Sequence, residues 1–271
     1  MNQERFVNIA RMILFIVLAG TLTQPLSAEK GQEPVISDTA EYPYILKQLS
    51  QTSLSGLRSE FEASNENICI QINEYGFAES KGACFDGPTQ IKITDEDSIV
   101  EMVKEWLVKN SKFTGVIKKS DAVVAGVGKI YNQRRIDFRA QTYNGLPMEG
   151  DAAPLRVFAH ARGVSRIGGH WFPTIEVPLE PTISEAFIKN KLNGRIFTYG
   201  DYAGKPRNYR IEQKDLSNVA HKVVFVKKSP QGLEFRLAWK MPVGQKSIPS
   251  WIVYVDAITG EELEIVQGFQ T

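Results

Sequence analysis

Cysteine and histidine are scarce in this chain, since its 271 residues include two cysteines and three histidines. Two cysteines cannot build a multi-cysteine zinc module or an iron–sulfur site, and three histidines leave little room for a histidine-rich metal centre. A surplus of one charge is also absent, because 32 basic and 31 acidic side chains give a net charge of +1. Binding to nucleic acid requires Lys and Arg gathered against phosphate. We therefore expect no metal, no cofactor and no nucleic-acid partner.

The motifs of common catalytic sites are missing too. No H-E-x-x-H occurs, although a zinc protease needs this spacing to place two His ligands on one helix face. We interpret the histidines as structural residues of predicted strands; they are His160, His170 and His221. Gly163–Gly168 is one residue too long for a G-x-S-x-G nucleophile turn, and Gly126–Lys129 lacks the spacing of a phosphate-binding loop. We therefore expect that the protein is not an enzyme.

An apolar run near the N-terminus, Met12–Gly20, follows Arg5 and Arg11 and precedes a small residue, Ala28. This order is typical of a secretory signal peptide, and the run is shorter than the roughly 20 residues that a spanning helix needs. We expect residues 1–28 to be a signal peptide that is cleaved after Ala28. The mature protein would then be secreted or periplasmic, without a membrane contact. A retained membrane anchor is the alternative.

Export permits disulfide bonds, and the two cysteines fit one. If a hairpin turns at Gly76-Phe77, as Gly favours, Cys69 on one arm faces Cys84 on the other. A loop of this size would stabilise the fold by roughly 3 kcal/mol. Two free buried thiols are the alternative, because buried Cys is common. We expect residues 29–93 to be an N-terminal extension that contains this hairpin.

Helical and strand-like patterns alternate along the chain. The spacing of apolar residues predicts a short helix within residues 42–60 and a second that begins at Thr94, and a capping box predicts a third that begins at Thr182. Residues 195–218 read as irregular, and Pro173–Pro181 reads as a linker. Alternating patterns bounded by turn residues predict strands, which are 125–131, 134–143, 153–161, 164–171, 220–227, 233–242, 249–257 and 261–267.

Each half of the chain therefore contains one predicted helix followed by about four predicted strands. A helix packed on one antiparallel sheet forms an α+β module of fewer than about 100 residues. The repeated order indicates a diverged duplication. The sequence predicts an α+β fold of two tandem cystatin-like modules, over residues 94–172 and 181–271, after the hairpin.

Two motifs resemble those of protease propeptides. Phe138–Gly150 resembles the Q-x-Y-x-G-x-P-x-x-G core of the FTP module, found in propeptides of thermolysin-like and fungalysin-like metalloproteases. Leu237–Lys240 and Trp251–Glu261 resemble the W-x-V-Y-V-D-A-x-T-G-E pattern of the PepSY module. We interpret the matched residues mainly as structural; they are Gln141, Tyr143, Gly145, Pro147, Trp251, Asp256 and Gly260.

In that family, such segments precede a zinc protease, assist its folding and block its cleft until they are removed. The resemblance implies an exported, non-catalytic binding protein that inhibits or assists the folding of a secreted zinc metalloprotease. An extended peptide can bind as a strand added to a sheet edge. The candidate contact residues occupy the place where a propeptide leads into the protease cleft; they are Gln267, Gly268, Phe269, Gln270 and Thr271.

A second interpretation belongs to a different class of function. Because a fold alone does not fix function, the chain is alternatively a cell-envelope interaction or scaffold module with no protease target. An enzyme of an unrecognised type is the third interpretation.

Overall fold

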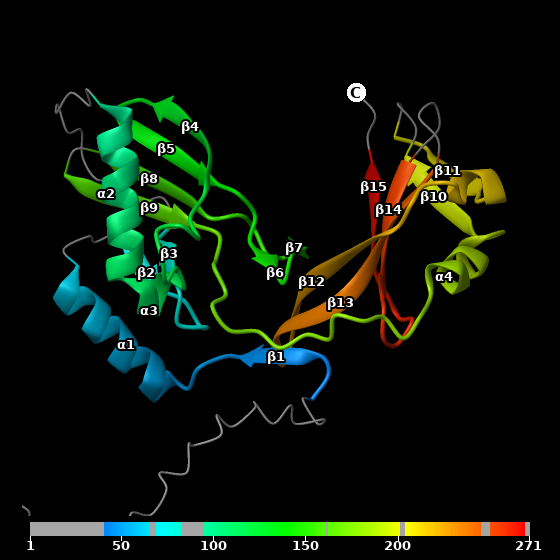
Figure 1. Cartoon of the computed structure of the whole chain (residues 1–271), viewed down its shortest axis with the longest axis horizontal. Helices are drawn as coiled ribbons and strands as arrows, with labels where there is room; N and C mark the ends of the chain where they lie inside the picture. The colour runs from blue at the N-terminus through cyan, green and yellow to red at the C-terminus, as the bar shows by residue number, and fades with distance from the viewer. Residues whose placement is uncertain are drawn as a thin grey trace, which may run out of the picture. The chain divides into compact units, whose positions relative to one another are not determined.

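A computed structural model describes residues 41–65, 69–82, 95–160, 162–200, 204–244 and 250–268 (Figure 1). The predicted signal peptide lies outside these residues. The described helices are α1 (Gln51–Ser64), α2 (Glu96–Lys109), α3 (Ser111–Thr114), α4 (Glu185–Leu192) and a 3₁₀ helix at Gln213–Leu216. The described strands are β1 (Tyr44–Lys47), β2 (Ile70–Ile72), β3 (Ala78–Ser80), β4 (Val124–Ile130), β5 (Gln133–Phe138), β6 (Thr142–Tyr143), β7 (Leu146–Gly150), β8 (Arg156–His160), β9 (Gly163–Gly168), β10 (Ile196–Gly200), β11 (Pro206–Arg210), β12 (His221–Ser229), β13 (Gly232–Val243), β14 (Ser250–Asp256) and β15 (Glu262–Gly268).

Helix α2 packs on an antiparallel sheet of four strands in the order β4-β5-β8-β9 (Figure 1). The helix begins where the side chain of Asp95 accepts hydrogen bonds from two backbone N–H groups of the first turn. Its buried residues, Ile99, Val103 and Leu107, recur at helical spacing and face the sheet. Since burying one such side chain stabilises a fold by about 1.5–3 kcal/mol, this stripe explains the docking of α2.

Helix α1 packs against the same core through Leu54 and Phe61, and the ring of Phe61 lies 5.1 Å from that of Phe113. It begins after Ser50, whose hydroxyl accepts a hydrogen bond from the backbone N–H of Ser53. The prediction of one helix within residues 42–60 is therefore wrong in its first part. Residues 44–47 form strand β1 instead.

The hairpin of β2 and β3 exists, but its predicted register is wrong. Ile70 pairs with Ser80 and Ile72 with Ala78, because the side chain of Asn73 accepts hydrogen bonds from the N–H groups of residues 75 and 77 and draws the loop tight. Cys69 is buried at 1% exposure, and its carbonyl accepts a hydrogen bond from the backbone N–H of Lys81. Cys84 lies outside the described residues, so the disulfide stays a prediction.

A seven-stranded mixed sheet forms the second core, in the order β15-β14-β13-β12-β7-β6, with β1 also paired to β13. Strand β7 runs parallel to β12, and Met148 pairs with Val224. Strand β1 runs antiparallel to β13, and Tyr44 pairs with Phe235. Large apolar side chains cover one face of β13, among them Phe235 and Leu237.

The expected architecture of two tandem cystatin-like α+β modules is wrong, because the described chain is mostly β and its sheets do not divide at the predicted linker. Strands β6 and β7 come from the first half of the chain and β1 from the N-terminal extension, yet all three belong to the sheet of the second half. Gly150 makes the parallel junction possible. It has φ +82°, and a Cβ there would lie 2.3 Å from the carbonyl oxygen of Val226.

The prediction that residues 195–218 are irregular is wrong as well. This segment forms the β10–β11 hairpin, in which Phe197 pairs with Tyr209, followed by the 3₁₀ helix. Strand β11 carries one large apolar side chain, Tyr209, among Pro206, Arg207, Asn208 and Arg210, so it shows no alternating pattern. Pairing with β10 and packing on Trp251, rather than its own pattern, form this strand.

Candidate functional site

The predicted contact residues fall at the end of β15, which is the terminal strand of the seven-stranded sheet. Gln267 and Gly268 pair with Trp251 and Ser250 of β14, whereas residues 269–271 lie outside the described ranges. Figure 1 shows β15 beside β14. In the part of the chain that the structure describes, no strand pairs with the other side of β15. The carbonyl of Leu263 accepts a hydrogen bond from Lys227 Nζ at 3.2 Å, and the other backbone groups that β14 does not use can pair with another strand.

Two β-branched side chains are exposed on this same strand. Ile265 is 36% exposed and Val266 is 39% exposed, and they pair with Val253 and Ile252 of β14. Exposed apolar residues on an edge strand favour pairing with another chain, which protected edges avoid by placing charges there. We call the unpaired side of Glu262–Gly268, with these two side chains, the β15 edge.

The β15 edge is held by a packed aromatic cluster behind β14. Trp251 is buried, and its ring contacts those of Phe197, Tyr199 and Tyr209 at centroid distances of 5.2, 6.1 and 5.7 Å. Edge-to-face aromatic pairs contribute about 0.5–1.5 kcal/mol each beyond their buried area. An ion pair between Arg195 and Glu262 ties the start of β15 to the same region. Contacts within the chain therefore hold β15 in place.

Asp256 organises the turn from β14 into β15. Its side chain is fully buried, and it accepts hydrogen bonds from the backbone N–H groups of Ile258 and Thr259 at 2.8 and 2.9 Å. Arg236 Nη1 donates to the same carboxylate at 2.9 Å and Tyr42 Oη at 3.0 Å. Burial, and then the negative charge of Asp256, raise the pKa of Tyr42.

Gly260 closes this turn at φ +74°, where only glycine is unstrained. Its carbonyl accepts a hydrogen bond of 2.7 Å from Lys191 on α4. The turn that directs β15 is thus held both by Tyr42, which precedes β1, and by helix α4.

The residues of the first motif lie away from the β15 edge. The amide of Gln141 donates to the carbonyl of Phe172 at 2.6 Å and accepts from its N–H at 2.8 Å. Tyr143 Oη accepts a hydrogen bond from the backbone N–H of Val177. Gly145 is the second residue of a two-residue turn with positive φ at both positions, and Pro147 pairs with Thr142. These contacts join the β6–β7 hairpin to the following chain.

One further polar cluster, outside both motifs, joins β7 to the two strands beyond β12. Glu149 accepts hydrogen bonds from Lys240 Nζ at 2.8 Å and from Tyr254 Oη at 2.6 Å. Burial, followed by the hydrogen bond to Glu149, raises the pKa of Tyr254. The arrangement links three strands of the same sheet through one carboxylate.

The histidines are dispersed over the described chain. His160 is buried and accepts a hydrogen bond from the backbone N–H of Arg162, His221 is exposed, and His170 contacts the rings of Phe77 and Phe172. In the described ranges, no three His, Cys, Asp or Glu side chains lie close enough together to hold a metal ion. Among the helices described, none has the length and apolarity that crossing a membrane requires.

The contact residues predicted from the sequence begin at the C-terminal end of β15 and do not include Ile265 and Val266. Residues 261–267 have the pattern of a strand, but nothing in that pattern says which side of the strand stays open. Tyr42 was missed as well, because nothing near it in sequence marks a contact with Asp256.

The comparisons with known proteins give little similarity. The sequence matches no protein-family model and no curated protein. Among solved structures, the C-terminal domain of YpeB from Bacillus megaterium is similar at 14% sequence identity, over 83% of this chain and 100% of that chain, with a TM-score of 0.31. This TM-score is too low to assign the chain to that fold.

Proposed function

We propose that the protein is an exported, non-catalytic binding protein of the propeptide type, which binds a secreted zinc metalloprotease through the β15 edge. The motifs around Gln141 and Trp251, which resemble those of FTP and PepSY modules, motivate the choice of partner. The single observation that carries the proposed binding mode is the open side of β15 with Ile265 and Val266 exposed.

The physical basis of this mode is strand addition. A peptide strand that pairs with β15 gains backbone hydrogen bonds along the edge, while its side chains contact those of β15 on both faces of the sheet. Because β14 and the aromatic cluster around Trp251 already hold β15 in place, ordering the β15 edge adds little entropic cost to binding. If the paired strand borders the protease cleft, β15 would block the entry of substrate and so inhibit the enzyme.

The test is inhibition of a purified thermolysin-type zinc protease, measured with a quenched fluorescent peptide substrate. The unmodified protein should inhibit stoichiometrically. The double variant Ile265→Lys, Val266→Lys should lose inhibition because it places two charges on the edge. A matched control, Ile117→Lys with Val219→Lys, changes two exposed apolar residues elsewhere in the chain and should inhibit normally.

A second variant tests the predicted contacts directly. Deleting Gln267–Thr271 removes the end of the edge and should weaken inhibition without unfolding the protein. If neither complex nor inhibition is found with any co-secreted metalloprotease, the proposed partner is wrong. The alternative, a cell-envelope scaffold that binds extended peptides of other proteins, is favoured if the edge variant instead loses an envelope partner found by affinity capture.

A further inference from the structure

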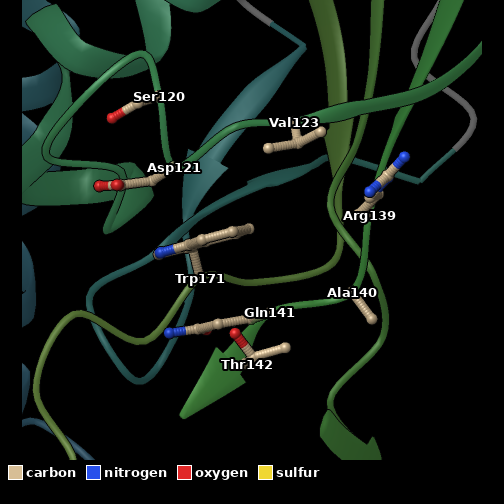
Figure 2. Close-up of a pocket in the computed structure, with 8 residues that line it drawn as sticks. All are labelled: Ser120, Asp121, Val123, Arg139, Ala140, Gln141, Thr142 and Trp171. Atoms are coloured by element: carbon tan, nitrogen blue, oxygen red, sulfur yellow. The ribbon is translucent and has the colours of Figure 1, made fainter. Parts of the chain in front are cut away.

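A cavity of about 440 Å³ opens at the other sheet, away from the β15 edge. It lies between the turn that precedes β4 and the segment that joins β5 to β6 (Figure 2). Its volume falls within the roughly 300–1,000 Å³ that ligand sites occupy. The residues that line it are Ser120, Asp121, Val123, Arg139, Ala140, Gln141, Thr142 and Trp171.

Hydrogen bonds fix the walls of this cavity. The backbone N–H of Arg139 donates to the carbonyl of Val123 at 2.8 Å, which ties the two walls together. The Gln141 amide is bonded in both directions to Phe172, the residue after Trp171. The carboxylate of Asp121 accepts a hydrogen bond from the N–H of Lys118. A ligand would therefore meet a shape that exists before it binds.

Some hydrogen-bonding groups in the walls have no partner among the residues that the structure describes. The guanidinium of Arg139 is exposed, and it has no ion pair or hydrogen bond among the described residues. Arg135 on β5 and Arg156 on β8, by contrast, both pair with Asp137. Within the same ranges, neither the backbone of Ala140 nor the indole N–H of Trp171 has a hydrogen-bond partner. These groups suit a ligand that carries acceptors and a negative charge.

The cavity is also polar at its ends and apolar between them. Figure 2 shows Asp121 and Arg139 on opposite sides, with Val123 and Trp171 between them. Val123 is 43% exposed, and the indole offers a large apolar surface with one donor. The arrangement matches an extended chain whose carboxylate reaches Arg139 and whose adjacent apolar side chain lies against Val123 and Trp171.

We propose that this cavity binds a short extended peptide through a carboxylate that pairs with Arg139. A guanidinium can hold a carboxylate with two parallel hydrogen bonds, and the free backbone of Ala140 can pair with the peptide backbone. The carboxylate is that of an acidic side chain or of a free C-terminus. This site does not depend on the function proposed for the β15 edge.

The test is a fluorescence-anisotropy titration of the full mature chain with fluorescein-Gly-Ser-Gly-Val-Leu-Glu. Binding should weaken about tenfold in Arg139→Gln, because one charge-assisted contact is lost. Lys129→Gln is the matched control, since it removes one exposed positive charge from β4 of the same sheet and should leave the affinity unchanged. Val123→Asp places a negative charge in the wall of the cavity. It should also weaken binding, because this charge repels the carboxylate of the peptide.

Two further peptides identify the source of the carboxylate. One ends in Gln with a free C-terminus, and the other keeps Glu but has an amidated C-terminus. Retained binding of the first assigns the site to a chain terminus, and retained binding of the second assigns it to an acidic side chain. The proposal is overturned if no peptide binds at about 1 mM, or if Arg139→Gln and Lys129→Gln have the same effect.

Discussion

Replacing Asp256 by Ala should destabilise the protein by about 3 kcal/mol, the lower end of the range for breaking a buried ion pair. The carboxylate is fully buried and accepts four hydrogen bonds, two from the turn backbone, one from Arg236 and one from Tyr42. The lower end applies because Arg236 keeps two other partners, Glu234 and Glu261. The loss would consist mainly of two backbone N–H groups left without an acceptor, each costing about 1–3 kcal/mol before relaxation and water entry, since the Tyr42 hydroxyl still has the carbonyl of Leu237 at 3.5 Å.

Asp256→Asn tests the contribution of the turn hydrogen bonds separately from that of the carboxylate charge. The amide oxygen can still accept from the backbone of Ile258 and Thr259, whereas the ionic contact with Arg236 is lost, so we expect about 1–2 kcal/mol. Glu261→Ala is the control, because Glu261 is exposed and contacts the same arginine, and an exposed pair contributes about 0–1 kcal/mol. Urea unfolding followed by tryptophan fluorescence gives all three values. A loss below about 1 kcal/mol for Asp256→Ala would refute the reasoning.

Three shorter predictions follow from other contacts. Gly150→Ala should cost about 2 kcal/mol or more in urea unfolding, because it strains a positive φ and places a Cβ against the carbonyl oxygen of Val226; an unchanged midpoint would contradict the parallel β7–β12 junction. Burial lowers the pKa of His170, so the unfolded chain binds its proton first, and stability should fall as the pH drops from about 6.5 through the lower folded value; His170→Phe should flatten this part of the pH profile. If Cys69 and Cys84 are bonded, Cys69→Ser with Cys84→Ser should lose roughly 3 kcal/mol, and equal stability with and without reductant would argue for free thiols.

The elements with strong local patterns could be predicted from the sequence. Helix α2 follows from Ile99, Val103 and Leu107 at helical spacing after acidic residues. The turn between β6 and β7 follows from Asn144-Gly145, which tolerates the positive φ that a two-residue hairpin loop needs. In both cases, the residues that decide the structure lie within a few positions of one another.

The pairing of distant strands could not be predicted in this way. Tyr44 of β1 lies opposite Phe235 of β13, and Met148 of β7 lies opposite Val224 of β12. Each of β1 and β7 is short and carries only a few apolar residues. The pattern of such a strand does not determine which other strand pairs with it. The energy that selects the pairing comes from the common core around Phe235, which forms only when all these strands are together. The cystatin-like expectation failed at this step.

In the candidate site, too, the strand itself is predictable from nearby residues, whereas its exposure depends on the whole sheet. Alternation within residues 261–267 predicts a strand, and the resemblance to propeptides directs attention to its end. Whether Ile265 and Val266 contact solvent or another strand, however, is decided by every other strand that does or does not take the place beside β15. An open edge is a property of the complete sheet order, and no residue of β15 encodes it alone. For the same reason, the sequence does not separate Arg139 from Arg135 and Arg156, whereas in the described part of the fold the latter two pair with Asp137 and Arg139 has no partner carboxylate. The sequence thus limits which residues can bind a partner, and the topology determines which of them are free to do so.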